Sequence, residues 1–427
     1  MSDKIRFVEL QDLCTSITDC HHSTPLYTES GKIVIRNFNI KKGRLQLDDI
    51  SYTDEENYLI RTSRAKPEAG DLIITREAPM GEVCIVPENL ECCLGQRMVL
   101  LKPNHNKVDS SYLLYTLMSR YVQTHISKSE GTGSIVSNLR IPVLKELNIP
   151  IYDIDRQTTI GKILSDIDSK ISLNNRINTE LEAMAKTMYD YWFVQFDFPN
   201  AEGKPYKSSG GKMVWSEELK REVPEGWEVK RLKEFADTGS GGTPLSTNSD
   251  YYENGNIPWI NSGEVNEPFI VNARKFVTNK GLENSSANLF KRGTILMAMY
   301  GATAGKVSII DIEATTNQAI CGIIPQQEDY KMYIKFGLED MYRYLVNLST
   351  GSARDNLSQD KIKDLQFIIP EKHVLKAFDK TANAAMSKIL INMKENLHLS
   401  SLRDWLLPML MNGQVKVNSG YEGKQRI

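Results

Sequence analysis

The sequence predicts an α+β protein made of two tandem globular domains of similar fold, each followed by a long helix. Two observations predict this architecture. A heptad pattern of apolar residues occurs twice along the chain, and short motifs ahead of each heptad stretch recur in the same order. We therefore expect two equivalent α/β-mixed halves with pseudo-two-fold symmetry, whose long helices pair as an antiparallel intramolecular coiled coil.

The first heptad stretch covers residues 156–192, and no proline or glycine interrupts it after Gly161. At a rise of about 1.5 Å per residue such a helix would be roughly 50 Å long, which exceeds an ordinary core helix. Two neighbouring rows of residues recur at heptad spacing. They are Ile160, Ile167, Asn174, Leu181 and Met188 on one row, and Leu164, Ile171, Asn178, Ala185 and Trp192 on the other.

The second heptad stretch, residues 371–412, is the expected partner. It repeats both asparagines at the same heptad positions (174 + 218 = 392 and 178 + 218 = 396). A polar residue in a coiled-coil seam lowers stability but fixes the partner and the register. Antiparallel pairing would place Asn174 near Asn396 and Asn178 near Asn392. The same register sets Arg403 against Ile167, a mismatch unless the arginine reaches solvent or a partner.

The residues that we predict to pair the two helices share the seam positions of the two stretches. They are Ile160, Leu164, Ile167, Ile171, Asn174, Asn178, Leu181, Ile389, Asn392, Asn396, Leu399 and Leu406. The alternative interpretation is two unrelated amphipathic helices, because heptads are common. The matched asparagines favour pairing.

Four motif pairs indicate that the globular halves are repeats. Residues 31–37 match 255–261, residues 70–74 match 293–297, residues 78–83 match 302–307, and residues 132–139 match 350–357. Short apolar runs predict strands at 71–75, 83–86, 98–101, 294–298 and 307–310. Apolar residues at three- and four-residue spacing predict helices at 112–127 and 333–348. Each half ends in an Ile/Leu-rich strand and a proline, Pro150 or Pro370, before its long helix.

These patterns predict a boundary scheme for the chain. The first domain covers residues 1–155 and its long helix 156–196, and a linker rich in Gly, Pro and Ser covers 197–226. Its aromatic residues Tyr206 and Trp215 suggest that the linker packs on a domain. The second domain covers residues 227–370 and its long helix 371–412, and a polar tail expected to be mobile covers 413–427.

Composition excludes several classes of protein. The net charge of −2 argues against a protein coated in positive charge, although local basic patches remain compatible with it. No stretch approaches the ~18 apolar residues of a membrane span, so we expect a cytoplasmic protein. The six cysteines form no CxxC pair. Reduced structural thiols are therefore the favoured interpretation over a zinc site built from Cys20, His21 and His22, and no metal site is predicted.

Catalytic motifs are missing from the sequence. It has no methyltransferase NPPY-type motif, no dinucleotide-binding glycine fingerprint, no HExxH and no nucleophile elbow. Residues 301–307 come nearest to a phosphate loop. They are one residue short between the glycines, and Val307 stands where Ser or Thr should hold magnesium. A glycine-rich turn between two strands explains this segment better, and no catalytic residue is predicted.

The second half carries an ordered set of motifs: GWEV at 226–229, GGTP at 241–244, IPWINSG at 257–263, GTIL at 293–296, GATAGK at 301–306 and TGSAR at 350–354. In this order they resemble the target-recognition domains of the DNA specificity subunit of type I restriction-modification systems. The linker at 198–213 is also similar to spacers of that family. The first half departs from the pattern, with Ser23-Thr24-Pro25 for the GGTP turn and Glu82 in place of the lysine.

The resemblance implies a non-catalytic subunit in which residues 1–155 and 227–370 are target-recognition domains. Each would read one half of a bipartite site on double-stranded DNA. The paired helices would bind two methyltransferase subunits, and restriction subunits that translocate DNA would join them. S-adenosylmethionine, ATP and magnesium would belong to those partners, and none would be bound by this chain.

Residues that contact DNA should be polar or basic and lie in loops, because Arg, Lys, Asn and Gln read base edges while hydroxyls and cations hold phosphates. In the first domain we predict Arg36, Asn37, Arg76, Gln96, Arg97, Ser134 and Arg140; in the second, Thr243, Asn261, Ser262, Tyr300, Lys306, Asn317, Gln318 and Arg354. The alternative function is a scaffold whose two modules bind proteins and read no DNA. A stand-alone enzyme is a third and more remote possibility.

Overall fold

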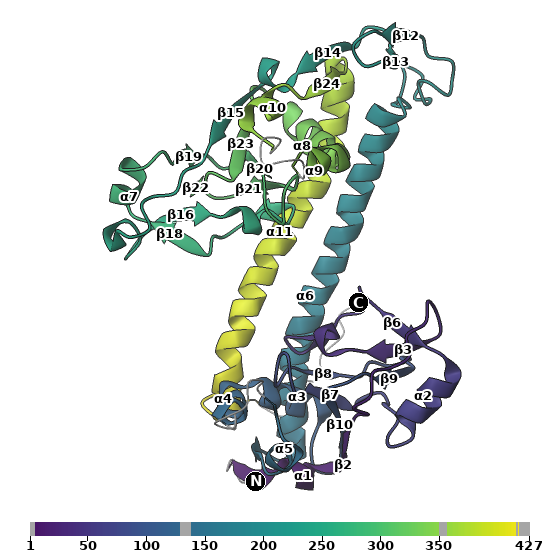
Figure 1. The fold of residues 1–427 in the computed structure, drawn as a ribbon, viewed down its shortest axis with the longest axis vertical. Helices are drawn as coiled ribbons and strands as arrows, with labels where there is room; N and C mark the ends of the chain where they lie inside the picture. Colours follow the sequence, from purple (N-terminus) through teal and green to yellow (C-terminus); the bar gives the residue numbers. More distant parts are fainter. Residues whose placement is uncertain (1–4, 129–137, 350–356, 416, 418–427) are drawn as a thin grey trace. The chain divides into compact units, whose positions relative to one another are not determined.

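The protein forms two compact units that share its two longest helices. The structure, a computed structural model, describes residues 5–128, 138–349, 357–415 and 417. One unit comprises residues 1–172 and 397–427, and the other comprises residues 173–396. Helices α6 (Ile154–Tyr189) and α11 (Lys372–Met411) each contribute to both units (Figure 1).

The N-terminal domain is built on a four-stranded antiparallel sheet of order β2-β10-β7-β8. A second sheet has the order β6-β3-β9, in which β3 and β9 run parallel. A β1–β11 ribbon closes the domain ahead of α6. The strands are β1 (Arg6–Glu9), β2 (Cys14–Asp19), β3 (Lys32–Ile35), β4 (Ile40–Lys41), β5 (Arg44–Leu45), β6 (Ser51–Thr53), β7 (Leu72–Thr75), β8 (Val83–Ile85), β9 (Cys92–Leu94), β10 (Met98–Pro103) and β11 (Asn148–Ile151). The helices are α1 (Leu10–Leu13), η1 (Asn37–Asn39), α2 (Glu55–Thr62), α3 (Ser110–Met118), α4 (Arg120–Lys128) and α5 (Ile141–Lys145).

The C-terminal domain has a five-stranded sheet of order β15-β23-β20-β21-β17 and a four-stranded sheet of order β18-β16-β22-β19. A β14–β24 ribbon closes it ahead of α11. The strands are β14 (Glu228–Arg231), β15 (Ala236–Ser240), β16 (Ile257–Ile260), β17 (Phe269–Ile270), β18 (Lys275–Val277), β19 (Leu289–Phe290), β20 (Ile295–Ala298), β21 (Val307–Ile310), β22 (Ala314–Thr316), β23 (Ile320–Pro325) and β24 (Gln366–Ile369). The helices are η3 (Leu232–Glu234), η4 (Ser249–Tyr251), η5 (Ser262–Glu264), α7 (Asn279–Glu283), α8 (Tyr330–Asp340), α9 (Tyr342–Ser349) and α10 (Gln359–Lys363).

The two domains have the same topology. Strands β2, β10, β7 and β8 occupy the sheet order of β15, β23, β20 and β21, and β6, β3 and β9 occupy that of β18, β16 and β22. The C-terminal domain adds β17 and β19 at sheet edges. The predicted fold class, two tandem α/β-mixed domains with paired long helices, is therefore confirmed. The strands predicted at 71–75, 83–86, 98–101, 294–298 and 307–310 correspond to β7, β8, β10, β20 and β21.

Both helices predicted at 112–127 and 333–348 are interrupted, which the apolar spacing does not reveal. The predicted helix 112–127 is α3 and α4, separated by Ser119 with an extended backbone (φ −62°, ψ 148°). The Ser119 hydroxyl accepts a hydrogen bond from the Val122 N–H at 3.4 Å, so it caps α4 as it ends α3. The predicted helix 333–348 breaks in the same place in the repeat, at Met341 between α8 and α9.

The linker 197–226 contains a hairpin that its composition did not predict, formed by β12 (Met213–Ser216) and β13 (Arg221–Pro224). Phe198 anchors the linker, since its ring stacks on Tyr206 and Trp227 with centroid distances of 4.6 and 4.9 Å. Tyr206 packs as expected, whereas Trp215 is exposed.

The long helices lie against each other in an antiparallel arrangement within each unit. In the unit 173–396, Asn174 Nδ2 donates to Asn396 Oδ1 at 2.9 Å, and Asn392 Nδ2 donates to Asn178 Oδ1 at 2.9 Å. These are the two contacts that the antiparallel register predicts. None of the twelve residues predicted to pair the helices is classed as exposed, and Ile160, Leu164, Asn174, Ile389 and Asn392 are almost fully buried. A single turn of π-helix, Asp190–Val194, extends α6.

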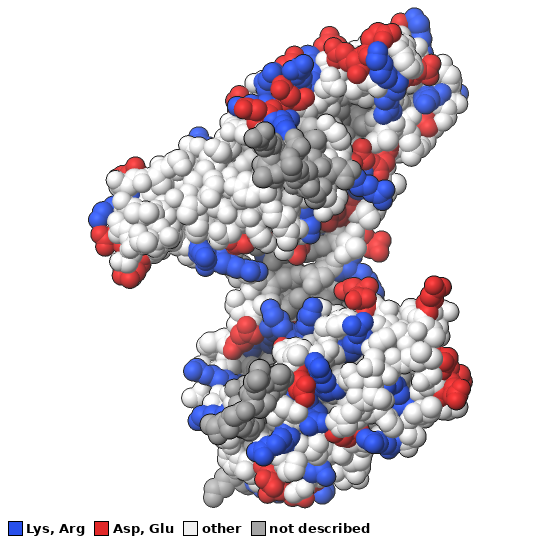
Figure 2. Space-filling model, in the orientation of Figure 1, with Lys and Arg blue, Asp and Glu red and all other residues white. Residues whose placement is uncertain are grey.

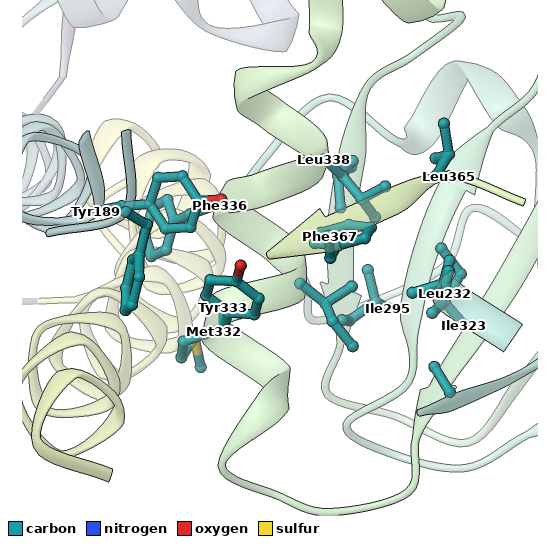
Figure 3. Packing of buried hydrophobic residues seen from close by; sticks show 14 of the residues in the cluster. Tyr189, Leu232, Ile295, Ile323, Met332, Tyr333, Phe336, Leu338, Leu365 and Phe367 are labelled. Carbon is teal, nitrogen blue, oxygen red and sulfur yellow. The ribbon is translucent and has the colours of Figure 1, made fainter. Parts of the chain in front are cut away.

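Each helix end is also part of a domain core. Ile160 and Leu164 of α6 and Leu410 and Met411 of α11 belong to the core of the first unit. In the second unit Tyr189 of α6 lies beside Tyr333 and Phe336 of α8, with ring centroids 5.7 and 6.3 Å apart (Figure 3). The rings of Phe193 and Phe378 meet edge to face at 4.9 Å. This aromatic packing joins the C-terminal end of α6 and the first half of α11 to the core of the second unit.

Candidate nucleic-acid interface

Four loops of the C-terminal domain meet at the ends of its strands. Gly242 N–H donates to the Thr316 carbonyl at 2.8 Å, Asn317 N–H to Ile260 at 3.0 Å and Met299 N–H to Ala319 at 2.8 Å. These bonds bring together loops 241–244, 261–264, 299–306 and 317–319, which we term the C-terminal loop surface. It carries every second-domain residue predicted to contact DNA that the structure describes.

The side chains of this surface are polar and largely accessible. Thr243 Oγ1 donates to Gln318 Oε1, and Thr303 Oγ1 donates to the Ser262 carbonyl at 2.7 Å. Thr243, Tyr300, Lys306 and Gln318 are exposed, and Asn261, Ser262 and Asn317 are half-buried. A surface of hydroxyl, amide and ammonium groups of this kind can hold phosphates and read base edges.

The N-terminal domain brings the equivalent loops together. Cys20 N–H donates to the Met98 carbonyl at 3.0 Å, Gly95 N–H to Ile35 at 2.8 Å and Arg76 N–H to Arg97 at 2.7 Å. Loops 20–25, 36–39, 76–82 and 95–97 form what we term the N-terminal loop surface. Gln96 Nε2 donates to the His22 carbonyl and to Thr24 Oγ1, the latter at 3.4 Å.

Backbone bonding defines which residues correspond between the two surfaces. Gly95 and Asn317 each donate to the last residue of an equivalent strand, Ile35 or Ile260. The Thr24–Gln96 pair is therefore equivalent to the Thr243–Gln318 pair. The residue that corresponds to Asn261 is Arg36, because both are N-caps of short 3₁₀ helices. The motif match of Asn37 with Asn261 was wrong by one residue.

The predicted arginines differ sharply in their surroundings. The Arg36 guanidinium lies over the Phe38 ring at 4.2 Å and donates to Ser51 Oγ at 3.0 Å. Arg140 is exposed at the N-terminus of α5, and Arg97 is exposed at the loop edge. Arg76 is mostly buried and donates to both Asp19 carboxylate oxygens at 2.8 and 3.0 Å, so its charge is used inside the domain.

The remaining predicted residues of this set are Asn37, Ser134 and Arg354. Asn37 Nδ2 donates to the Ala78 carbonyl at 2.6 Å, which ties η1 to the 76–82 loop. Ser134 and Arg354 lie outside the described residues. Sequence reasoning passed over Glu77 and Asn138, which lie beside the N-terminal arginines: Asn138 Nδ2 donates to Glu77 Oε1 at 2.7 Å. Asn138 lies in the repeated segment 132–139, but no sequence motif links it to Glu77.

The glycine-rich turn 301–306 joins β20 to β21, as expected for two strands linked by a turn. A pocket of about 320 Å³ beside Lys306 is lined by Glu182, Glu267 and Glu339. Burial and the neighbouring Glu182 raise the pKa of Glu267, and burial raises the pKa of Glu339. Because carboxylates line this pocket, it is a poor site for a nucleotide phosphate. The first-domain equivalent of Lys306, Glu82, accepts a hydrogen bond from the Lys42 N–H at 2.6 Å.

Neither a metal site nor a reactive thiol is found in the described part of the chain. It contains no group of three His, Cys, Asp or Glu residues placed to hold a metal ion. All six cysteines are free, and burial raises the pKa of Cys84 and Cys92 to about 12, which favours the unreactive thiol. No described helix has the length and apolarity that a membrane crossing requires. On the face shown in Figure 2, basic and acidic side chains are interspersed over both units.

Comparison with known proteins decides the family. The family model of the type I restriction modification DNA specificity domain matches residues 2–183 and 224–394, so that each match covers one domain and more than half of the long helix that follows it. The chain belongs to this family. It is a DNA specificity subunit of a type I restriction-modification system, the non-catalytic component by family definition.

Relatives of this specificity subunit span most of its length. It is 26% identical to the MjaIX specificity subunit of Methanocaldococcus jannaschii over 82% of this chain and 78% of that protein. It is also 26% identical to the HindI specificity subunit of Haemophilus influenzae over 81% of this chain and 86% of that protein. The crystal structure of the S subunit from M. genitalium superposes with a TM-score of 0.61 at 16% identity, covering 96% of this chain and 97% of that one. This last likeness shows a shared fold.

Proposed function

We propose that each domain of this specificity subunit reads one half of a bipartite DNA target through its loop surface. The observation that carries this proposal is the equivalence of the two surfaces. The Thr24–Gln96 and Thr243–Gln318 pairs occupy the same place in two copies of one topology. Two similar readers suit two half-sites, because a duplex offers equivalent groove positions about a local dyad.

The proposed domain boundaries are those predicted from the sequence. Residues 1–155 and 227–370 are the target-recognition domains, 156–196 and 371–412 are the helices that pair, 197–226 is the linker and 413–427 is a tail. The proposed role of the helix pair is to set the separation between half-sites, since a coiled coil is stiff and the seam asparagines allow one register. The recognition domains then determine which bases are read.

The proposed partners are two methyltransferase subunits held by the helices, together with restriction subunits that translocate DNA. S-adenosylmethionine, ATP and magnesium would be bound by those partners. Since DNA is the target, the proposed compartment is the cytoplasm. The near-neutral net charge of −2 predicts weak binding of DNA by this subunit alone, with partners supplying many of the phosphate contacts.

The test is to assemble the subunit with its methyltransferase partner and to map the methylated positions in DNA. The proposal expects one bipartite sequence with a fixed gap. Replacing the N-terminal domain by that of a relative should change one half of the sequence and leave the other half and the gap unchanged. A complex that binds all sequences equally would overturn the proposal and favour a protein-binding scaffold.

A further inference from the structure

A chain of charged and amide groups leads from the interior of the N-terminal domain to Arg97 on its loop surface. Asp19 accepts from Arg76 Nη1 at 2.8 Å, and Arg76 Nη2 donates to Asn138 Oδ1 at 3.1 Å. Asn138 Nδ2 donates to Glu77 Oε1 at 2.7 Å, and Glu77 Oε2 lies 3.4 Å from Arg97 Nε. Hydrogen bonds therefore connect the first four members of this relay, and an ion pair connects the fourth to Arg97.

The relay ends in an accessible guanidinium. The Arg97 side chain is 52% exposed, whereas those of Arg76 and Glu77 are 12% and 21% exposed. The ion pair of Arg97 with Glu77 runs through Nε, and within the described residues no hydrogen bond engages Nη1 or Nη2. The backbone at Arg97 has φ +66°, a left-handed conformation that non-glycine residues seldom adopt and that recurs at functional sites.

The fold itself does not need these charges. In the C-terminal domain, the equivalent backbone bond joins Met299 to Ala319, so Met299, Tyr300 and Ala319 replace Arg76, Glu77 and Arg97. Ala319 is buried, and the same turn forms without the relay. Removing the Asp19–Arg76 pair from water has a desolvation cost that stability alone does not explain. The network is therefore particular to the N-terminal domain and is not required by the topology that the two domains share.

We infer that Arg97 reads a guanine in the half-site bound by the N-terminal domain, and that Glu77, Asn138 and Arg76 are its positioning residues. The inference rests on the proposed function. A guanidinium with a carboxylate beside Nε keeps its two Nη groups available as a fork, and this fork matches guanine O6 and N7 in the major groove. Holding the fork before DNA arrives reduces the entropy lost on binding.

The experiment measures base preference of the assembled methyltransferase complex on a library in which each position of both half-sites is varied. Arg97→Ala should reduce discrimination at one position of one half-site by about 5- to 140-fold, which corresponds to about 1–3 kcal/mol at about 1.4 kcal/mol per factor of ten. Arg97→Lys keeps the charge but loses the fork, so the same position should relax while the salt dependence stays. Arg6→Ala, an exposed arginine in the β1–β11 ribbon, is the matched control and should change neither.

Glu77→Gln tests the positioning role. It should weaken the same guanine preference by less than Arg97→Ala, with affinity for mismatched DNA unchanged. If Arg97→Lys and Arg97→Ala both keep the wild-type preference at every position, the inference is wrong while the proposed function stands. If the wild-type complex shows no half-site that depends on the N-terminal domain, the proposed function itself is wrong. If the Arg97→Ala variant does not assemble into the methyltransferase complex, the base preference of the Arg97→Lys variant tests the inference.

Discussion

Arg403 of α11 donates from Nη1 to Asp168 Oδ1 of α6 at 2.8 Å, so the residue that breaks the apolar heptad pattern has a partner on the facing helix. The same carboxylate accepts from Arg44 Nη2 at 2.9 Å and from the Tyr115 hydroxyl at 2.7 Å. One side chain thereby joins both long helices to the N-terminal domain within the first unit. The expected mismatch between Arg403 and Ile167 is avoided, because Arg403 forms an ion pair with Asp168 between the two helices.

Asp168→Ala should therefore destabilise the first unit by about 1.5–3 kcal/mol, since it removes the acceptor of charged hydrogen bonds. The measurement is urea unfolding followed by amide hydrogen exchange of segments of the first unit, so that its unfolding is separated from that of the second. Asp166→Ala is the control, because Asp166 is exposed on the same helix, where it forms an ion pair with Lys162. Its effect should stay within about 0.5 kcal/mol. Equal effects of the two substitutions would contradict the assigned role of Asp168.

The Asn178–Asn392 contact can be measured by a double-mutant cycle. The two Asn→Ala substitutions should show a coupling free energy of about 0.5–1.5 kcal/mol, because each removes the partner of the other. Asn392→Ala combined with Asn284→Ala, an asparagine with no shared partner, should be additive within about 0.5 kcal/mol. Zero coupling between Asn178 and Asn392 would refute the antiparallel register.

Lys306→Ala tests a phosphate contact on the C-terminal loop surface. A lysine that neutralises one phosphate makes the plot of the logarithm of the DNA-binding constant against the logarithm of salt concentration steeper by about 0.9. The Lys306→Ala variant should therefore have a slope that is shallower by about that amount. It should also bind all DNA sequences more weakly to a similar extent. The complex with its methyltransferase partner is titrated with target DNA at several salt concentrations. Lys204→Ala in the linker, where the lysine is exposed beside Glu202, should leave the slope unchanged. A change of base preference in Lys306→Ala would instead assign Lys306 to base reading.

Asp379 of α11 should give the second unit a pH-dependent stability. Burial and the nearby Asp329 raise the pKa of Asp379 to about 6 in the folded chain, from an ordinary value of 3.8. The group therefore stabilises the fold below about pH 4, and this contribution is lost as pH rises through about 6. Asp379→Asn should raise stability at pH 7.5 by about 1 kcal/mol after allowance for solvent screening.

The corresponding difference in Tm between Asp379→Asn and wild type should shrink toward zero at pH 4. Asp360→Asn, at an exposed position of α10, is the control and should have no such pH dependence. An Asp379→Asn variant that is less stable than wild type at pH 7.5 would show that the carboxylate makes a favourable contact there.

The heptad asparagines and the repeated motifs could be interpreted without coordinates because both follow local rules. Coiled-coil spacing places Asn174 opposite Asn396 once the helices are taken as antiparallel, and matched turns such as 70–74 and 293–297 lie at matched strand starts. The break at Ser119 also has a local cause, the capping hydroxyl, which a search for helix N-caps inside the predicted helix would have found.

Periodicity and ordered motifs can be read along the chain, so the doubled architecture, the register of the helices and the family resemblance were all predictable without coordinates. The surroundings of the individual loop residues, in contrast, could be described only from the folded structure. Arg76 and Arg97 look alike in sequence, yet the fold places one against Asp19 in the interior and the other at the surface beside Glu77. The physical reason is that burial and hydrogen-bond partners come from segments far apart in the chain, such as residues 19, 76 and 138, which no local spacing brings together.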